Sequence, residues 1–152
     1  MKLKQALTLA IIITSLTACN KEKRYSNKLI KGEKWSVKSI NLDGNQINAG
    51  GVWLVTQGVN IYHQVPQVSW QNDTSNTIFN WQFQNEGEIF QLNYSHGTTE
   101  CDSSTLTYLD YLCYDITGTY KVEQHKKKEM RFTSTQTLGY NGKDVVISIE
   151  KQ

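Results

Sequence analysis

The segment from residue 77 to residue 94 constrains the fold of this chain more than any other, because large apolar and polar side chains alternate along it. A period of two places alternate side chains on opposite faces of an extended strand, so that one face is buried and the other meets water. Asn85-Glu86-Gly87 interrupts the alternation and supplies turn residues. We therefore predict an antiparallel hairpin. Its buried face would consist of Phe79, Trp81, Phe83, Phe90, Leu92 and Tyr94.

Further runs rich in β-branched and aromatic residues are separated by turn signals. These runs cover residues 35–40, 52–57, 59–65, 116–122, 130–132 and 145–149. Asp43-Gly44 and Asn141-Gly142 are dipeptides that favour tight hairpin turns. Polar outer faces and short turns predict an all-β fold, an antiparallel meander of about eight strands. The meander would form one small barrel, with a β-sandwich as the alternative.

The first eighteen residues differ from the rest in composition. Lys2 and Lys4 precede an apolar run from Ala6 to Leu16, which has the layout of an export signal. This run is too short for a membrane-spanning helix, which needs about 20 apolar residues. Leu16-Thr17-Ala18-Cys19 is similar to the cleavage box of bacterial lipoproteins. That resemblance implies cleavage before Cys19, with diacylglycerol on its sulfur and often a third acyl chain on its amino group.

The lipoprotein resemblance predicts the cellular location of the protein and the boundaries of its segments. Residues 1–18 would be a signal peptide, residues 19–33 a lipidated and flexible basic tether, and residues 34–152 the barrel domain. The lipid would anchor the protein in the outer membrane or the cell membrane, because two or three acyl chains hold a protein where one is marginal. The domain would then face the periplasm or the cell surface.

The charge of the mature chain limits its partners. Lys2 and Lys4 leave with the signal peptide, so the 16 basic residues become 14, against 14 acidic ones. A net charge of zero makes nucleic acid a poor candidate partner. The basic residues just after Cys19 either contact anionic lipid headgroups or form a merely solvated tether. These residues are Lys21, Lys23, Arg24 and Lys28.

Two stretches resemble lipocalin-like barrels. Gly32-Glu33-Lys34-Trp35 is similar to the opening strand of that family, in which a glycine shortly precedes a tryptophan at the barrel floor. Here two residues separate the glycine and the tryptophan, instead of one. The segment from Tyr114 to Tyr120 resembles the closing hairpins of small lipocalin-like lipoproteins. The resemblance implies an up-and-down barrel with joined ends, whose interior is either packed by its own side chains or holds a small apolar ligand.

Cys101 and Cys113 remain once the lipid accounts for Cys19. In an oxidising compartment we predict a disulfide between them, worth about 3 kcal/mol in the chain-entropy model. Neither zinc-type nor C-x-x-C spacing is present, so we predict no metal site and no redox pair. The segment 106–112 between them is apolar on both parities. We predict either a flap across the barrel mouth that exposes some of Tyr108, Leu109 and Tyr111, or an ordinary strand covered by the loop around residue 66.

Catalytic motifs are missing from the chain, and the three histidines lie far apart. We therefore expect a binding protein that is no enzyme and uses no cofactor: a carrier of a small apolar ligand, or a protein- or glycan-interaction module with a filled barrel. Residues 39–120 lack Lys and Arg, which suits neutral ligands. Trp53, Tyr62 and Trp70 would provide a glycan surface, unless their presence simply reflects strand composition. The candidate binding residues are Trp81, Tyr94, Tyr108, Leu109 and Tyr111.

Overall fold

The computed structural model describes residues 21–56, 66–95 and 106–152. Its helices are an N-terminal helix over residues 21–32, the 3-10 turn η1 (Asn85–Gly87) and α2 (Tyr108–Asp115). Its strands are β1 (Lys34–Leu42), β2 (Asn45–Ile47), β3 (Val52–Thr56), β4 (Gln67–Gln71), β5 (Asn76–Gln84), β6 (Ile89–Tyr94), β7 (Gly118–His125), β8 (Glu129–Ser134) and β9 (Val145–Lys151). The predicted strand over 59–65 lies outside the described residues.

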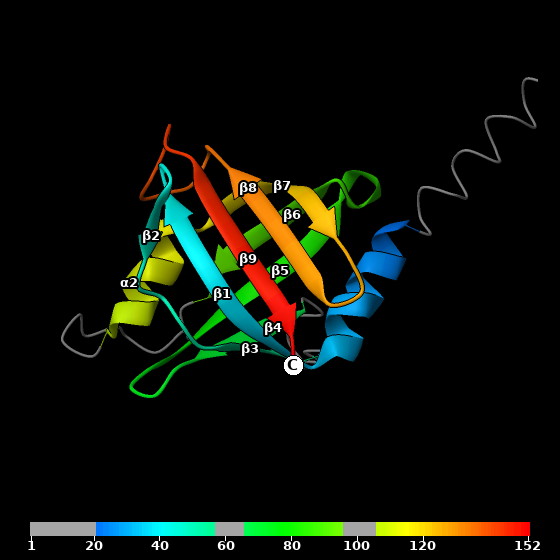
Figure 1. The fold of residues 1–152 in the computed structure, drawn as a ribbon, viewed down its shortest axis with the longest axis horizontal. Helices are drawn as coiled ribbons and strands as arrows, with labels where there is room; N and C mark the ends of the chain where they lie inside the picture. The colour runs from blue at the N-terminus through cyan, green and yellow to red at the C-terminus, as the bar shows by residue number, and fades with distance from the viewer. Residues whose placement is uncertain (1–20, 57–65, 96–105) are drawn as a thin grey trace, which may run out of the picture.

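The strands form a closed antiparallel barrel (Figure 1). Each of β1 and β3 to β9 pairs with the next along the chain, β1 also pairs with β9, and β2 adds one short strand to β1. The predicted all-β meander of eight strands is therefore confirmed. The strands form a barrel and not the alternative β-sandwich. The predicted hairpin is also confirmed, since β5 and β6 pair across η1 with Phe83 opposite Phe90. Asn141-Gly142 lies in the longer loop between β8 and β9.

Aromatic side chains fill the inside of the barrel. In β5 every second residue from Thr77 to Phe83 is buried, as the alternation predicted. The rings of Phe90 and Phe132 stack with centroids 4.3 Å apart, although β7 separates their strands β6 and β8 in the sheet. Trp53 and Phe79 likewise meet at 4.9 Å across the position of β4. Each of these ring pairs joins two strands that have another strand between them. Such side chains can meet only if both point into the barrel interior.

The N-terminal helix lies against one end of the barrel, where we had expected a flexible tether (Figure 1). Leu29 is fully buried, and its carbonyl accepts a hydrogen bond from Trp35 Nε1 at 2.9 Å. Tyr25 stacks on His125 with ring centroids 3.6 Å apart. Tyr25 and Leu29 are four residues apart and so share one face of a helix. The tether prediction was wrong because it weighed the charges of this segment and not its apolar pair.

Gly32 fits directly against the buried indole of Trp35 at this end of the barrel. A β-carbon at Gly32 would lie 2.2 Å from Trp35 Nε1, which is far inside van der Waals contact. The glycine therefore permits the helix end to reach the barrel floor. The glycine–tryptophan pair that suggested a lipocalin-like opening strand is in contact, despite the longer spacing.

The segment 106–115 contains helix α2 at the opposite end of the barrel, and not the predicted strand or flap (Figure 1). Thr107 begins the helix with a capping box, because its hydroxyl accepts from Asp110 N while Asp110 Oδ2 accepts from Thr107 N. The buried residues recur at helical spacing: Leu109, Leu112, Cys113 and Ile116. Apolar residues on both parities are what a period of 3.6 produces, so the period was misread.

Candidate functional site

The predicted binding residues separate into core and surface groups. Trp81 and Leu109 are fully buried, so neither contacts a partner at the outer surface. Tyr94 is half-buried, and its ring meets the edge of Tyr114 at 6.3 Å. Tyr108 and Tyr111 are exposed, as predicted for the flap, although the segment that carries them is a helix.

The outer face of α2 carries three exposed tyrosines, Tyr108, Tyr111 and Tyr114, which we call the tyrosine face. Each has between 52% and 55% of its surface exposed. Tyr114 was not predicted as a surface residue because the segment was expected to be extended; helical spacing places it with the other two. A contiguous exposed aromatic surface on a single chain marks an interaction site more often than chance.

A neutral groove adjoins the C-terminal end of α2. It has a volume of about 590 Å³ and no charged residue among those lining it. The lining residues are Gln91, Asn93, Thr117, Gly118, Thr119, Gln136, Thr137, Leu138 and Asn141. Leu138 is exposed, and its backbone N–H bonds the carbonyl of Thr117, just beyond the last turn of α2. The groove and the tyrosine face therefore share one end of the barrel.

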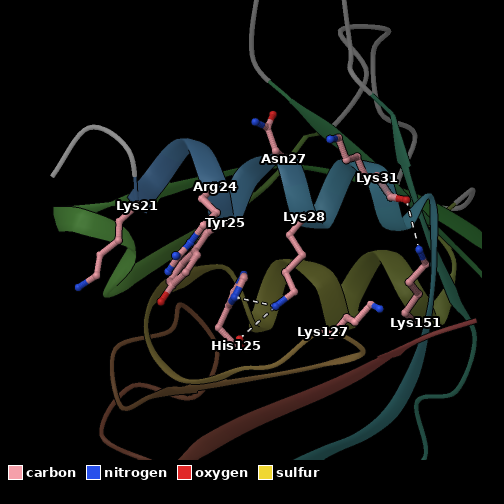
Figure 2. A pocket seen from close by; sticks show the side chains of 9 residues that line it. All are labelled: Lys21, Arg24, Tyr25, Asn27, Lys28, Lys31, His125, Lys127 and Lys151. Atoms are coloured by element: carbon pink, nitrogen blue, oxygen red, sulfur yellow. Dashed lines mark hydrogen bonds between the residues drawn. The ribbon is translucent and has the colours of Figure 1, made fainter. Parts of the chain in front are cut away.

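The other end of the barrel holds an open cleft of about 990 Å³, which we call the cationic cleft (Figure 2). Six of its nine lining residues carry a positive charge: Lys21, Arg24, Lys28, Lys31, Lys127 and Lys151. Tyr25, Asn27 and His125 complete the lining, and none of the nine is acidic. Three parts of the chain meet here: the N-terminal helix, the turn between β7 and β8, and the end of β9.

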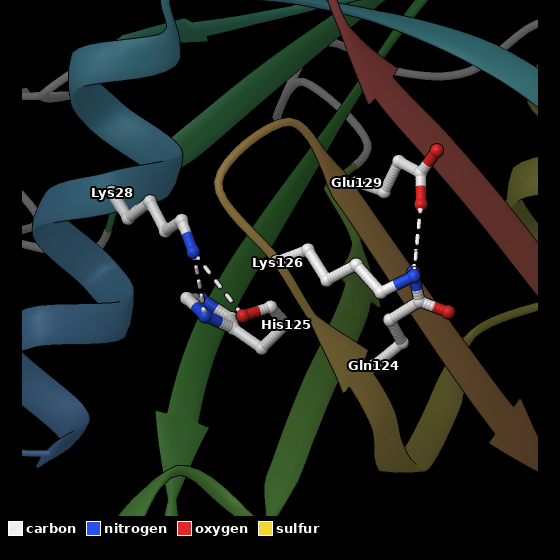
Figure 3. Close-up of polar contacts among 5 residues, drawn as sticks. All are labelled: Lys28, Gln124, His125, Lys126 and Glu129. Atoms are coloured by element: carbon white, nitrogen blue, oxygen red, sulfur yellow. Dashed lines mark hydrogen bonds and ion pairs between the residues drawn. The ribbon is translucent and has the colours of Figure 1, made fainter.

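His125 is a half-buried residue of the cationic cleft. Lys28 Nζ lies 3.3 Å from His125 Nδ1 and donates to the His125 carbonyl at 3.2 Å (Figure 3). Burial, and then the charge of Lys28, lower the pKa of His125 to about 4. The imidazole is therefore neutral near pH 7, and Nδ1 can accept a hydrogen bond from the Lys28 ammonium group. Although its neighbours in sequence are lysines, His125 is not simply solvated, because the ring of Tyr25 stacks on it.

Acidic residues near the cationic cleft are engaged elsewhere. Glu150 pairs with Lys38 at 2.9 Å, and Glu129 pairs with Lys126 at 3.6 Å. Glu22 accepts a hydrogen bond from the backbone of Glu86. Among the described residues, no ion pair includes a cation of the cleft. The positive charges of the cleft are therefore not paired with any carboxylate in the described parts of the chain.

Only part of this cleft was predicted from the sequence. Lys21, Arg24 and Lys28 were noted as a basic group, but nothing local placed Lys127 and Lys151 beside them. The run of three lysines at 126–128 was the one sequence feature that indicated a second basic segment. The joining of the two ends of the barrel, β1 with β9, brings these segments together.

The glycan surface predicted around Trp53 and Trp70 does not form, because both side chains are fully buried. Their indoles meet edge to face at 6.3 Å inside the barrel. Tyr62, the third member of that surface, lies outside the described residues. Any recognition of a neutral ligand therefore falls to other residues.

Of the two predicted disulfide partners, Cys101 and Cys113, the structure describes only Cys113. Cys113 is a free, fully buried cysteine in the described structure, while Cys101 lies outside the described residues. Burial, and then the charge of Asp110, raise the pKa of the Cys113 thiol well above its usual value. Cys113 belongs to the buried face of α2, so its packing does not depend on a disulfide.

The described parts of the chain also bear on metal binding and on membrane insertion. There, no group of three or more His, Cys, Asp or Glu side chains is placed to hold a metal ion. No helix in those parts has the length and apolar character needed to cross a bilayer. Cys19, the predicted lipidation site, lies outside the described residues. No protein-family model, curated protein or solved structure matches this chain.

Proposed function

We propose that this chain is a lipid-anchored, non-catalytic protein of the bacterial cell envelope that binds a neutral glycan at the α2 end of a filled barrel. The lipoprotein-like box ending at Cys19 supports the lipid anchor and the location in the cell envelope. The observation that carries the binding proposal is the tyrosine face beside a groove without charged residues.

The filled interior favours this function over a carrier. A simple lipocalin-type carrier needs an apolar cavity among the strands. Here Trp81, Phe90 and Phe132 are each at most 1% exposed and contact other rings inside the barrel. A ligand could enter only if several of these aromatic side chains moved together. Binding on the outer surface requires no such rearrangement.

The chemistry of the α2 end suits a neutral sugar chain. Exposed tyrosine rings offer flat apolar faces against which the apolar face of a sugar ring can pack, and their hydroxyls remain available for hydrogen bonds. Amide side chains both donate and accept, as sugar hydroxyls do. Gln91, Asn93, Gln136 and Asn141 provide such amides in the groove.

A glycan array tests the binding proposal with the purified protein. We expect binding to neutral oligosaccharides, and a loss of about tenfold or more in affinity for the Tyr108→Ala/Tyr111→Ala variant, because aromatic contacts dominate such surfaces. Ile78→Ala is the matched control, since Ile78 is an exposed apolar residue that lines neither surface. Unchanged binding in the tyrosine variant would contradict the proposed site. A co-purified lipid found by mass spectrometry would instead favour a carrier.

Metabolic labelling with a fatty acid tests the anchor. The label should enter the wild-type protein and hold it in the membrane fraction, and Cys19→Ala should lose both. Label retained by the variant would rule out lipidation at Cys19. Protease treatment of whole cells then distinguishes display on the cell surface, where the domain is digested, from a periplasmic location, where it is protected.

A further inference from the structure

The cationic cleft collects like charges from segments far apart in the chain. Lys28 and the backbone of His125 are 97 residues apart, and Lys151 and Lys31 are 120 residues apart, yet both pairs are in hydrogen-bond contact. Placing six cations around one open cleft is electrostatically unfavourable unless an anion offsets it. No carboxylate among the lining residues does so.

Backbone carbonyls hold two of these ammonium groups in position. Lys151 Nζ donates to the carbonyl of Lys31 at 3.4 Å, near the end of the N-terminal helix, and Lys28 Nζ donates to that of His125 (Figure 2). A carbonyl orients a lysine without cancelling its charge, unlike a carboxylate. Burial and the neighbouring charge of Arg24 lower the pKa of Lys28, and the charge of a bound anion would oppose this lowering by stabilising the protonated ammonium group. The cleft therefore favours a negatively charged occupant.

The position of the cleft points to the source of that charge. Lys21 lines the cleft and follows Cys19 by two residues. The cleft is at the barrel end with the N-terminal helix, and α2 with its tyrosine face is at the opposite end (Figure 1). Acyl chains on Cys19 would place Lys21, one wall of the cationic cleft, within about 7 Å of the lipidated residue, because two residues span no more than that.

We propose that the cationic cleft docks on the phosphate groups of anionic phospholipids in the leaflet that carries the anchor, an inference that rests on the proposed lipid anchor. Docking holds the end with the N-terminal helix against the membrane and directs the tyrosine face away from it. A single lipidated cysteine would not by itself determine which end of the barrel faces the membrane. The proposal thus assigns the two ends of the barrel separate tasks.

Amine labelling of the reconstituted, lipidated protein tests this orientation. The protein is placed in vesicles of phosphatidylglycerol or of phosphatidylcholine, and an amine-reactive reagent is read at each lysine by mass spectrometry. Labelling of Lys127 and Lys151 should fall at least about fivefold in phosphatidylglycerol, the factor that corresponds to about 1 kcal/mol per lysine beside an anionic surface. Lys143, in the loop at the opposite end, should label equally in both. Equal labelling of the cleft lysines in the two lipids would overturn the proposal.

A pair of charge-matched variants separates a built cleft from general attraction. Lys21→Gln/Lys127→Gln removes two cleft charges that form no ion pair with the other described residues. Lys121→Gln/Lys143→Gln removes two charges outside the cleft. We expect the first variant to restore labelling of Lys151 in phosphatidylglycerol vesicles at least about threefold, and the second to leave it unchanged. Equal effects of the two variants would reject the cleft as the docking surface.

Two further outcomes have separate meanings. Protection of the cleft lysines by inorganic phosphate in phosphatidylcholine vesicles would mean that the cleft takes free phosphate, which would overturn headgroup docking. An intact mass without acyl chains would refute the anchor. Unacylated protein mixed with the same vesicles still tests the cleft, because protection of Lys151 by phosphatidylglycerol then comes from docking alone. Failure of the anchor and failure of the cleft are thus distinguishable.

Discussion

Replacement of Gly32 by alanine tests whether the N-terminal helix packs on the barrel. The added β-carbon would lie 2.2, 2.4 and 2.6 Å from three atoms of the Trp35 indole. This ring cannot simply move aside, because it is fully buried and bonded to the Leu29 carbonyl. If the helix retreats instead, Trp35 loses that acceptor and Leu29 loses its burial. Either response destabilises the folded protein.

The expected magnitude combines opposing contributions. Overpacking of a rigid site costs about 1–3 kcal/mol. Alanine in place of glycine at the end of a helix returns at most about 1 kcal/mol. We therefore expect Gly32→Ala to lower the free energy of unfolding by about 1–2 kcal/mol, and to lower Tm by about 3–10 °C for a domain of this size.

Urea unfolding followed by tryptophan fluorescence measures this change. Gly50→Ala is the matched control, since Gly50 is exposed and a β-carbon there meets nothing within 4 Å. Its free energy of unfolding should stay within about 0.5 kcal/mol of wild type, apart from a small gain from the stiffer unfolded chain. A Gly32→Ala variant as stable as wild type would mean that residues 21–32 do not pack against Trp35, and are the flexible tether expected from sequence.

Three other predictions concern single residues. The His125 imidazole should titrate near pH 4 by NMR. The unfolded chain takes up this proton near pH 6.5 and the folded chain only near pH 4. The free energy of unfolding should therefore fall by about 1 kcal/mol as the pH drops between these values, after allowance for the half-exposed ring. Titration near pH 6.5 would refute the contact with Lys28. Thr107→Ala should cost about 1 kcal/mol through the lost capping box, and hydrogen exchange should speed up first in α2; uniform exchange across the domain would argue against a local cap. Cys113 should resist iodoacetamide in the native protein because burial raises its pKa, and it should react after unfolding without a reductant; a need for reductant would restore the disulfide with Cys101.

The strands were predicted from the local alternation of apolar and polar side chains. The alternation from residue 77 to 94 identified both the hairpin and its buried face, and Asp43-Gly44 correctly marked the turn between β1 and β2, where both residues have positive φ. Side chains of a strand alternate whatever the rest of the chain does, so a single sequence contains this information. The same reasoning failed at 106–115, because a short segment with apolar residues on both parities fits a helix as well as a covered strand.

The sequence by itself determined most of the barrel strands, though not β4, and which of their faces are apolar, because these depend on neighbours along the chain. The tertiary structure decided that β1 meets β9, that helices lie at both ends, and that Lys28, Lys127 and Lys151 line one cleft. It also placed Trp53 and Trp70 inside the barrel and the tyrosine face outside. Such outcomes depend on strand order and on contacts between residues as many as 120 positions apart, which no local period encodes.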